Sequence, residues 1–334
     1  MDQSYRTLDY EGPRGTEQLP VLAEIDDFER HPLEPPRQKR RWRLNLLLFL
    51  LTCASTFVIG ASNSANVGGH WMMALLAGDR TVLSRIFVEN WQSGLIYMAA
   101  VMGILLAHEM GHFLQALRYH VPASLPFFIP VPLAPIGTMG AVIGMQGSQA
   151  NRKELFDIGL SGPIAGLIVA LPILYFGVMM APSHGPVYSN VEFGAPLLLQ
   201  WMFEWLRPDD AGGGVRLLGS LNPLLMAGWV GLLITGLNML PVSQLDGGHV
   251  AYALFGRKAF WLARGVILLA IAYMVIAQVY GWIIMLALVM AIGPDHPPTH
   301  DDRVPLGWWR IVLGILSLGI SIICLHPNPL APIH

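Results

Sequence analysis

Long apolar runs separated by short polar segments dominate the chain. They occupy residues 44–59, 94–117, 155–180, 221–240, 259–279, 282–292 and 306–325. A helix of about 20 apolar residues is long enough to cross the hydrocarbon core of a bilayer. The pattern therefore predicts an all-α polytopic membrane protein with about six or seven transmembrane helices.

The apolar segment 126–147 does not read as a transmembrane helix, because helix-breaking residues recur along it. They are Pro126, Pro130, Pro132, Pro135, Gly137, Gly140, Gly144 and Gly147. Non-helical backbone at membrane depth is tolerated only where protein or a water-filled cavity covers it. We expect a re-entrant loop or a β-hairpin packed against the 94–117 helix. The alternative is a surface loop that is merely apolar.

The composition agrees with a membrane protein. Of the 334 residues, 54% are hydrophobic and 13% are charged, and the mean hydropathy is +0.51. Residues 1–43 hold 9 acidic and 8 basic side chains, out of 22 and 20 in the whole chain. This distribution favours a polar, disordered tail over 1–43, a membrane-embedded domain over 44–326 and a short C-terminal tail over 327–334.

Five basic residues lie close before the first apolar run. They are Arg37, Lys39, Arg40, Arg41 and Arg43. Because Lys and Arg collect on the cytoplasmic side of membrane proteins, this cluster predicts a cytoplasmic amino terminus. The other basic residues are dispersed and the net charge is −2, which gives no indication of nucleic-acid binding.

The sequence His-Glu-Met-Gly-His at 108–112 lies inside the apolar run 94–117. On a helix, His108 and His112 share one face, where two imidazoles can bind one Zn²⁺. Glu109 lies beside them and can take a proton from the attacking water. The motif also arises by chance among packing residues. However, ionisable side chains inside a membrane are costly, and they indicate function.

A catalytic zinc site needs a third protein ligand and one position for water. Asp246 is the candidate, because Pro241 and the Gly247-Gly248 pair break the helix around it. Two alternatives stay open: Asp246 caps the following helix, or His249 is the third ligand in its place. We expect His249 instead to cap or to pair with groups around the ligands.

The polar segment 293–303 could form a second metal site. It contains Asp295, His296, His300, Asp301 and Asp302. We favour a cytoplasmic loop stiffened by proline. Cys53 and Cys324 fall in the first and the last apolar runs, and we expect no disulfide between them.

Several motifs together resemble the site-2 protease family of intramembrane zinc metallopeptidases. They are HEMGH in an apolar helix, GTMGAVI at 137–143, SGPIAG at 161–166 and NMLPVSQLDGG at 238–248. The resemblance covers residues 94–326. The segment 293–314 also resembles the C-terminal region of some bacterial and plastid members.

The resemblance implies that His108, His112 and Asp246 bind one Zn²⁺ per chain. It also implies that Glu109 is the catalytic acid and base, and that Asn238 holds the substrate backbone or assists the oxyanion. The expected activity is hydrolysis of a peptide bond within or near a transmembrane segment of a membrane protein. The expected location is a bacterial inner membrane.

A helical substrate must be unwound before it can be cleaved. We expect the Pro/Gly-rich segment to offer backbone groups with which an extended substrate pairs as an added strand, with Gly137, Thr138, Met139 and Gly140 as the substrate-binding residues. Two other functions stay open: a zinc-binding membrane transporter and a non-proteolytic membrane scaffold. Neither requires Glu109 beside a metal ligand.

Overall fold

The computed structural model describes most of the chain after residue 41, and every statement below concerns that part. The described residues are 42–64, 71–132, 134–145, 147–181, 191–210, 217–218, 221–279, 281–293 and 296–332. The predicted polar tail lies outside the described residues except for Trp42 and Arg43, and Asp295 of the predicted polar loop lies outside them as well.

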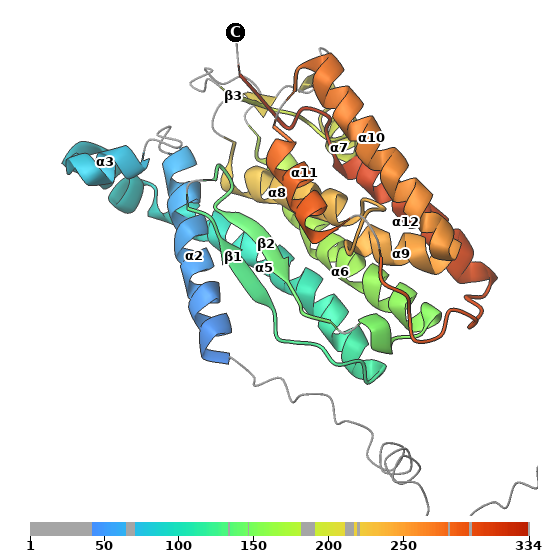
Figure 1. The fold of residues 1–334 in the computed structure, drawn as a ribbon. Coiled ribbons are helices and arrows are strands. Elements are labelled where there is room, and N and C mark those ends of the chain that lie inside the picture. The colour runs from blue at the N-terminus through green and yellow to red at the C-terminus, as the bar shows by residue number, and fades with distance from the viewer. Residues whose placement is uncertain are drawn as a thin grey trace, which may run out of the picture. The chain divides into compact units, whose positions relative to one another are not determined.

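The predicted apolar runs form helices whose ends differ from the expected ones by a few residues. They are α2 (Trp42–Ser64), α5 (Trp91–Arg118), α6 (Arg152–Met179), α8 (Pro223–Asn238), α10 (Ala259–Ala277), α11 (Ile283–Ile292) and α12 (Trp308–Cys324). A further helix, α9 (Asp246–Phe255), contains the Gly247-Gly248 pair, so the expectation that these glycines break the helix was wrong. Helix α5 packs against α2, α6 and α8, and α6 also packs against α9 (Figure 1). The bundle therefore joins the two motif-bearing helices, α5 and α9, through α6.

Four helical segments are long and apolar enough to cross a membrane. They are α2, α5, α6 and the segment Asp246–Ala277, which contains α9 and α10. Helices α8 and α12 are apolar but shorter. The 3₁₀ turn η5 (Gly256–Lys258) separates α9 from α10 at the basic segment where the sequence predicts a loop. The total of six or seven transmembrane helices stays a prediction.

Helix α6 begins where its sequence provides a complete cap. The Asn151 side chain accepts hydrogen bonds from the backbone N–H groups of Lys153 and Glu154, and the Glu154 carboxylate accepts one from the Asn151 N–H. This capping box satisfies donors that a helix start leaves open. Helix α8 begins similarly, with Asn222 as the cap and Pro223 at the first helical position.

The Pro/Gly-rich segment forms an antiparallel pair of strands, β1 (Phe127–Pro130) and β2 (Thr138–Val142). Side chains of neighbouring helices hold it: the Ser55 hydroxyl of α2 donates to the Gly137 carbonyl at 2.6 Å, and the Tyr97 hydroxyl of α5 donates to the Ile136 carbonyl at 2.9 Å. The hairpin is one of the two forms expected for this segment. Its placement at membrane depth stays a prediction.

The loops contain more structure than the sequence predicted. The described residues between α2 and α5 form α3 (Trp71–Ala77), α4 (Arg80–Ser84) and a π-helical turn η2 (Arg85–Glu89). Short 3₁₀ turns occur at η3 (Gly147–Gln149) and η4 (Pro208–Asp210).

The described part of the segment 182–219, which connects α6 to α8, contains regular secondary structure. It contains α7 (Leu197–Leu206) and two strands, β3 (Val191–Phe193) and β4 (Leu217–Leu218). Strand β3 lies between β4 and β5 (Leu330–Pro332), antiparallel to both. The predicted C-terminal tail thus supplies a strand to a sheet that begins about 140 residues earlier.

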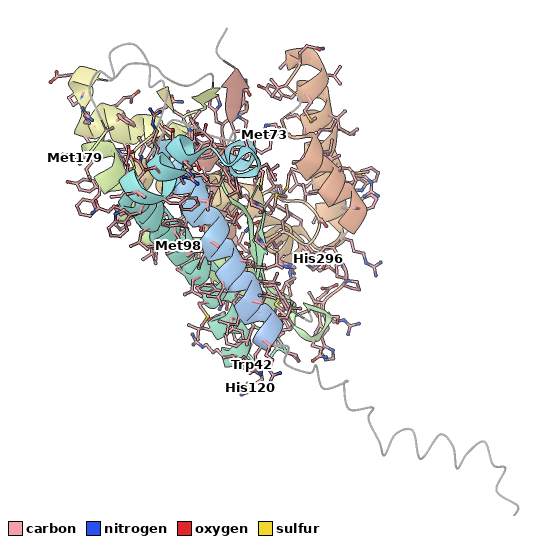
Figure 2. The ribbon with its side chains drawn as sticks, turned by 90° about the vertical axis from the view of Figure 1, so that its left-hand side faces the viewer. Trp42, Met73, Met98, His120, Met179 and His296 are labelled. Carbon is pink, nitrogen blue, oxygen red and sulfur yellow. The ribbon has the colours of Figure 1, made fainter. Side chains whose placement is uncertain are left out.

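The main core lies between α5, α6 and α8. Its largest fully buried side chains include Tyr97, Leu174 and Trp229. The Trp229 indole N–H donates to the Gly194 carbonyl at 2.8 Å, which ties the loop before α7 to the core. Trp42 at the start of α2 and His120 after α5 lie at one end of the bundle, and Met73 and Met179 lie at the other (Figure 2).

Candidate metal centre

Two histidines of α5 and one aspartate of α9 bring their side-chain tips together. His108 Nε2 lies 3.1 Å from Asp246 Oδ2, and His112 Nε2 lies 3.2 Å from Asp246 Oδ1. The two Nε2 atoms are 3.2 Å apart. The four-residue spacing places both imidazoles on one face of α5, as predicted, and the first residue of α9 supplies the carboxylate.

The spacing of these donors suits a small tetrahedral cation. One ligand atom from each residue lies within 4.8 Å of the other two, and no other such His, Cys, Asp and Glu group occurs among the described residues. Tetrahedral Zn²⁺ with bonds of about 2.0–2.1 Å separates its ligand atoms by roughly 3.3 Å. The observed separations are close to that value, so the residues present fit a zinc ion.

Asp246 does not act as the cap of α9, which was the alternative left open by the sequence. The cap position is Leu245, and no side chain caps the helix there. The Asp246 carboxylate instead contacts both histidines. Its position in the first turn of α9 is electrostatically favourable, because a helix N-terminus carries partial positive charge.

The main chain of α6 orients one of the two imidazoles. His112 Nδ1 lies 2.8 Å from the carbonyl oxygen of Ile158. Because a carbonyl oxygen only accepts hydrogen bonds, Nδ1 carries the proton and donates it. The lone pair of His112 is then on Nε2, which faces His108 and Asp246 and is available to a metal.

Glycines of α6 allow the histidines to approach this closely. A Cβ on Gly162 would lie 2.0 Å from His112 Nε2, and a Cβ on Gly166 would lie 3.1 Å from His108 Nδ1. On the opposite helix, a Cβ on Gly111 would lie 2.5 Å from the Ser161 carbonyl oxygen. Any side chain at Gly162 therefore occupies the space of a predicted ligand.

Glu109 is buried at 3% exposure, one residue from His108. It lines the same cavity as the three predicted ligands. Among the described residues, none forms a hydrogen bond or an ion pair with its carboxylate. A buried carboxylate without a hydrogen-bond partner is costly as a structural element, and its position in the cavity suits proton transfer.

Asn238 is the last residue of α8, and its side-chain amide reaches the site. Its Nδ2 lies 3.2 Å from His108 Nε2. The chain then turns through 239–245, where Ser243 has a positive φ of 55°, and re-enters the site at Asp246. The eight-residue spacing between Asn238 and Asp246 thus places both side chains at one centre.

The cavity at this centre has a volume of about 120 Å³. The hairpin contributes Ala141, Val142, Ile143 and Met145 to its lining, and α9 contributes His249. The four residues predicted to bind substrate, 137–140, lie just before this lining. Gly137 packs against α2, and the Gly140 N–H is bound to the Thr138 hydroxyl within the hairpin at 3.0 Å.

The other polar groups considered in the sequence are not part of the three-ligand group. His249 Nδ1 lies 2.6 Å from His296 Nε2, which agrees with the expected pairing of His249 outside the ligand set. His300 is exposed. Cys53 and Cys324 are free, as expected.

Sequence reasoning missed three features of the site: the Ile158 carbonyl, the partner of His249, and the contact of Gly162 with His112. Gly159, Gly162 and Gly166 recur at intervals of three and four residues, which places them on one helix face. That spacing could have identified the face of α6 that meets the histidines. The Ile158 carbonyl has no such signal, because every residue carries one.

Comparison with known proteins gives matches over most of this bundle. The model of peptidase family M50 matches residues 96–279. The probable zinc metalloprotease EGY2, chloroplastic, of Arabidopsis thaliana is 31% identical over 71% of this chain and 42% of its own length. The probable zinc metalloprotease EGY1, chloroplastic, of the same plant is 29% identical over 89% of this chain and 56% of its own length.

The chain therefore spans about half the length of the curated relatives it matches. No solved structure matches the chain.

Proposed function

Because the chain belongs to peptidase family M50, we propose that it is an intramembrane zinc metalloprotease. Its reaction is hydrolysis of a peptide bond within or near a transmembrane segment of a membrane protein. The observation that carries this proposal is the position of Glu109: a buried carboxylate without a hydrogen bond or ion pair among the described residues, in the same cavity as two histidines and an aspartate.

His108, His112 and Asp246 would hold one Zn²⁺ per chain. When bound, zinc would lower the pKa of a water molecule and polarise the carbonyl of the scissile bond. The hydrogen bond from His112 to the Ile158 carbonyl keeps the Nε2 lone pair directed at the ligand group. The close packing of α6 keeps both imidazoles in place.

Glu109 takes a proton from the attacking water and later gives one to the leaving amine. A carboxylate can act in both directions when it is held within hydrogen-bond reach of both groups. The Asn238 amide is a donor at the edge of the site, and it would hold a substrate carbonyl or the oxygen on which negative charge develops.

The hairpin would supply the pairing partner for an unwound substrate. Strand β2 is paired with β1 on one edge, and the sheet has no third strand among the described residues. An extended peptide can add to such an edge through backbone hydrogen bonds. Residues 137–140 begin this edge, and Ala141 to Ile143 carry it into the cavity.

We propose six or seven membrane passes: the four longer segments with α8 and α12 give six, and α11 would give the seventh. The end that carries Trp42 and His120 would face the cytoplasm (Figure 2), because Arg43 and Arg118 lie beside these two residues in the chain. We place the protein in a bacterial inner membrane. The plant relatives bear chloroplast names.

The decisive experiment compares three variants of the purified protein with a Leu-rich transmembrane peptide interrupted by Gly-Pro as substrate. Glu109→Gln should retain about one zinc per chain and lose cleavage by several orders of magnitude. Asp246→Ala should lose zinc and cleavage together. His300→Ala, at an exposed position of the polar loop, is the matched control and should change neither.

Normal cleavage by Glu109→Gln would refute the hydrolytic mechanism, and full zinc content in Asp246→Ala would remove Asp246 from the ligand set. Uptake of zinc into vesicles by the wild-type protein, unaffected by Glu109→Gln, would favour a transporter instead.

A second experiment tests the hairpin edge from the substrate side. Replacing one substrate amide by an ester removes an N–H donor without changing the side chain. Esters next to the cleaved bond should lower kcat/KM about 2- to 10-fold each, whereas an ester ten residues away should not. Equal rates for all ester peptides would exclude strand pairing.

A further inference from the structure

The loop after α11 is bound at both ends to the helices around the site. At its start, the Ser243 hydroxyl donates to the Gly293 carbonyl at 2.5 Å. At its end, the His300 N–H donates to the Ala150 carbonyl at 2.9 Å, and the Arg152 N–H donates to the Asp301 carbonyl at 3.2 Å. These backbone contacts fix the path of the loop across α9 and the start of α6.

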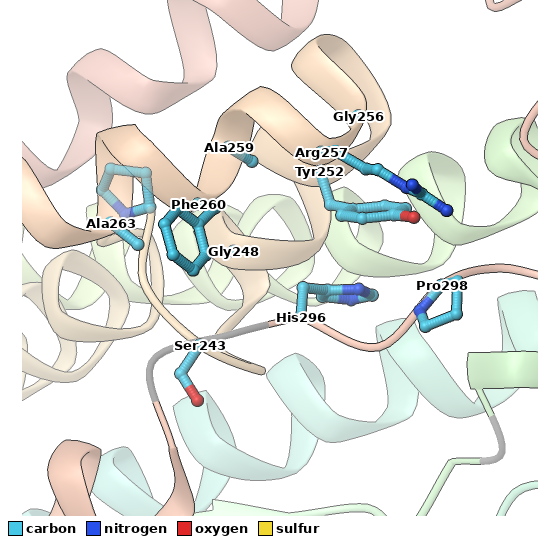
Figure 3. A pocket seen from close by; sticks show the side chains of 11 residues that line it. Ser243, Gly248, Tyr252, Gly256, Arg257, Ala259, Phe260, Ala263, His296 and Pro298 are labelled. Carbon is cyan, nitrogen blue, oxygen red and sulfur yellow. The ribbon is translucent and has the colours of Figure 1, made fainter.

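Side chains hold the middle of the loop on α9. The Tyr252 hydroxyl donates to Asp302 at 2.9 Å. The imidazole of His296 stacks on the ring of Tyr252, with centroids 4.5 Å apart and an angle of 23° between the planes. Figure 3 shows the two rings facing each other beside Pro298. The His296 ring therefore has a defined place and orientation.

The hydrogen bonds of His296 determine which of its nitrogens carries the proton. Its Nδ1 lies 2.5 Å from the Pro297 carbonyl oxygen, which can only accept. Nδ1 is therefore the donor. In the neutral ring Nε2 then has a lone pair, and burial lowers the pKa of His296 below its ordinary value, which favours the neutral ring.

The same reasoning gives the tautomer of His249. Its Nδ1 lies 2.6 Å from His296 Nε2. Because the His296 nitrogen is an acceptor, His249 Nδ1 must carry the proton. The remaining nitrogen of His249, Nε2, then has a free lone pair. His249 lines the cavity that contains Glu109 and the three predicted ligands, and Nε2 is the ring nitrogen that His296 does not occupy.

We infer that His249 is a substrate-binding residue that accepts a hydrogen bond from a backbone N–H of the peptide next to the scissile bond, and that His296 is a positioning residue that fixes the required tautomer. This inference rests on the proposed proteolytic function. It gives the loop between α11 and α12 a role in the reaction.

An acceptor of this kind answers a need of the bound peptide. An extended substrate presents N–H groups on both sides, and an N–H that is buried without an acceptor costs about 1–3 kcal/mol. In the proposed mechanism the Asp246 carboxylate binds the metal and the Glu109 carboxylate transfers protons. The Asn238 amide donates a hydrogen bond. A neutral imidazole with a lone pair can accept an N–H without adding charge to the cavity.

Replacing His249 by asparagine tests its two ring nitrogens separately. The asparagine amide N–H₂ takes the position of Nδ1, and no atom replaces Nε2. His249→Asn should keep the contact with His296, retain zinc and raise KM for the transmembrane peptide about 10-fold. His296→Ala should raise KM about 3- to 10-fold. The double variant should be no worse than His249→Asn alone, because His296 acts through His249.

The exposed His300 on the same loop gives the control, and His300→Ala should match the wild type. Loss of zinc in His249→Asn would make His249 a metal ligand and overturn the inference. Additive effects of the two substitutions would also overturn it, because they would show that His296 acts independently.

The ester peptides identify the substrate partner. In His249→Asn, one ester should cause no additional loss, and its position marks the N–H that His249 accepts. If every ester remains as harmful in the variant as in the wild type, His249 binds no substrate N–H.

A spectroscopic measurement tests the tautomer without any activity. In protein labelled with ¹⁵N-histidine and embedded in lipid, His249 should show a protonated Nδ1 and an unprotonated Nε2, assigned by its absence in His249→Asn. His296→Ala should shift this ring towards a mixture of tautomers. A protonated Nε2 in the wild type overturns the inference, whereas failure of the protease proposal appears separately as cleavage by Glu109→Gln.

Discussion

Helix α6 and the segment Asp246–Ala277, which contains α10, are both long and apolar enough to cross a membrane, yet α6 and α10 use glycine in opposite ways. On α6, a Cβ added at Gly159, Gly162, Gly166 or Gly177 would come within 3.1 Å of another side chain or of backbone. On α10, a Cβ at Gly265 would meet nothing within 4 Å. The same residue type thus marks close packing on one helix and an open face on the other.

This difference shows what an apolar helix sequence leaves unspecified. Hydropathy indicates that both helices can lie in a membrane, but it does not indicate which one approaches its neighbours closely. The glycines of α6 recur on one face, and that face receives His112, His108 and the backbone of α8. Spacing, and not glycine content, distinguishes the helix that builds the site.

The largest effect in this comparison is expected at Gly162. A methyl group there would occupy the space 2.0 Å from His112 Nε2, so the imidazole must leave the ligand group. We expect Gly162→Ala to lose most of its zinc and to lower cleavage at least about 100-fold, since misplacement by 1 Å can have that effect. Metal analysis and a peptide cleavage assay measure both. A fully loaded, active Gly162→Ala protein would show that α6 can move away.

Gly177 tests whether a clash on α6 affects the site when it occurs far from the histidines. A Cβ there would lie 2.5 Å from the backbone nitrogen of Leu225, at the start of α8. We expect Gly177→Ala to destabilise the protein by about 1–3 kcal/mol, seen as a lower midpoint of thermal unfolding in detergent. The folded fraction should keep its zinc and its kcat. Loss of zinc at full folding would mean that the two ends of α6 are coupled.

Gly166 should show an intermediate effect on the reaction. A Cβ there would lie 3.1 Å from His108 Nδ1, a contact that a shift of a few tenths of an ångström relieves. We expect Gly166→Ala to retain zinc and to lower kcat/KM by up to about 10-fold, because a small displacement of a ligand disturbs the reacting geometry less. The ratio of its rate to that of Gly162→Ala measures how steeply the site depends on ligand position.

The smallest effect is expected at Gly265, which serves as the matched control on α10. Gly265→Ala adds a methyl group to open space and raises helix propensity by up to about 1 kcal/mol. Cleavage and zinc content should equal those of the wild type, and the unfolding midpoint should stay equal or rise. A drop in cleavage, in zinc content or in the unfolding midpoint would show that α10 has a packing partner on that face.

Sequence reasoning reached the local features of this molecule and missed those made by distant contacts. The run 155–180 predicted α6 to within three residues at its start, because hydropathy is a local signal. Strand β3 pairs with β5 at the other end of the described chain. Strands of two or three residues carry no periodic pattern strong enough to be recognised, so the small sheet was missed.

At the site, motif spacing predicted the ligand residues, but it did not predict the groups that surround them. The four-residue spacing from His108 to His112 fixes a shared helix face in advance of any structure. The partner of His249 could not be predicted in this way, since His296 lies 47 residues away and reaches it through a loop whose path depends on several backbone contacts.

The hydrogen bond from His112 to the Ile158 carbonyl bears on how this chain tolerates mutation. The acceptor belongs to the main chain, so it is present whichever amino acid occupies position 158. A single nucleotide change can replace the isoleucine, but it cannot delete the oxygen that orients the ligand. The genetically fragile position is Gly162 instead, a residue with no functional group, where almost any missense change adds atoms at the imidazole. Inactivating variants of this protein should therefore include positions that take no part in its chemistry.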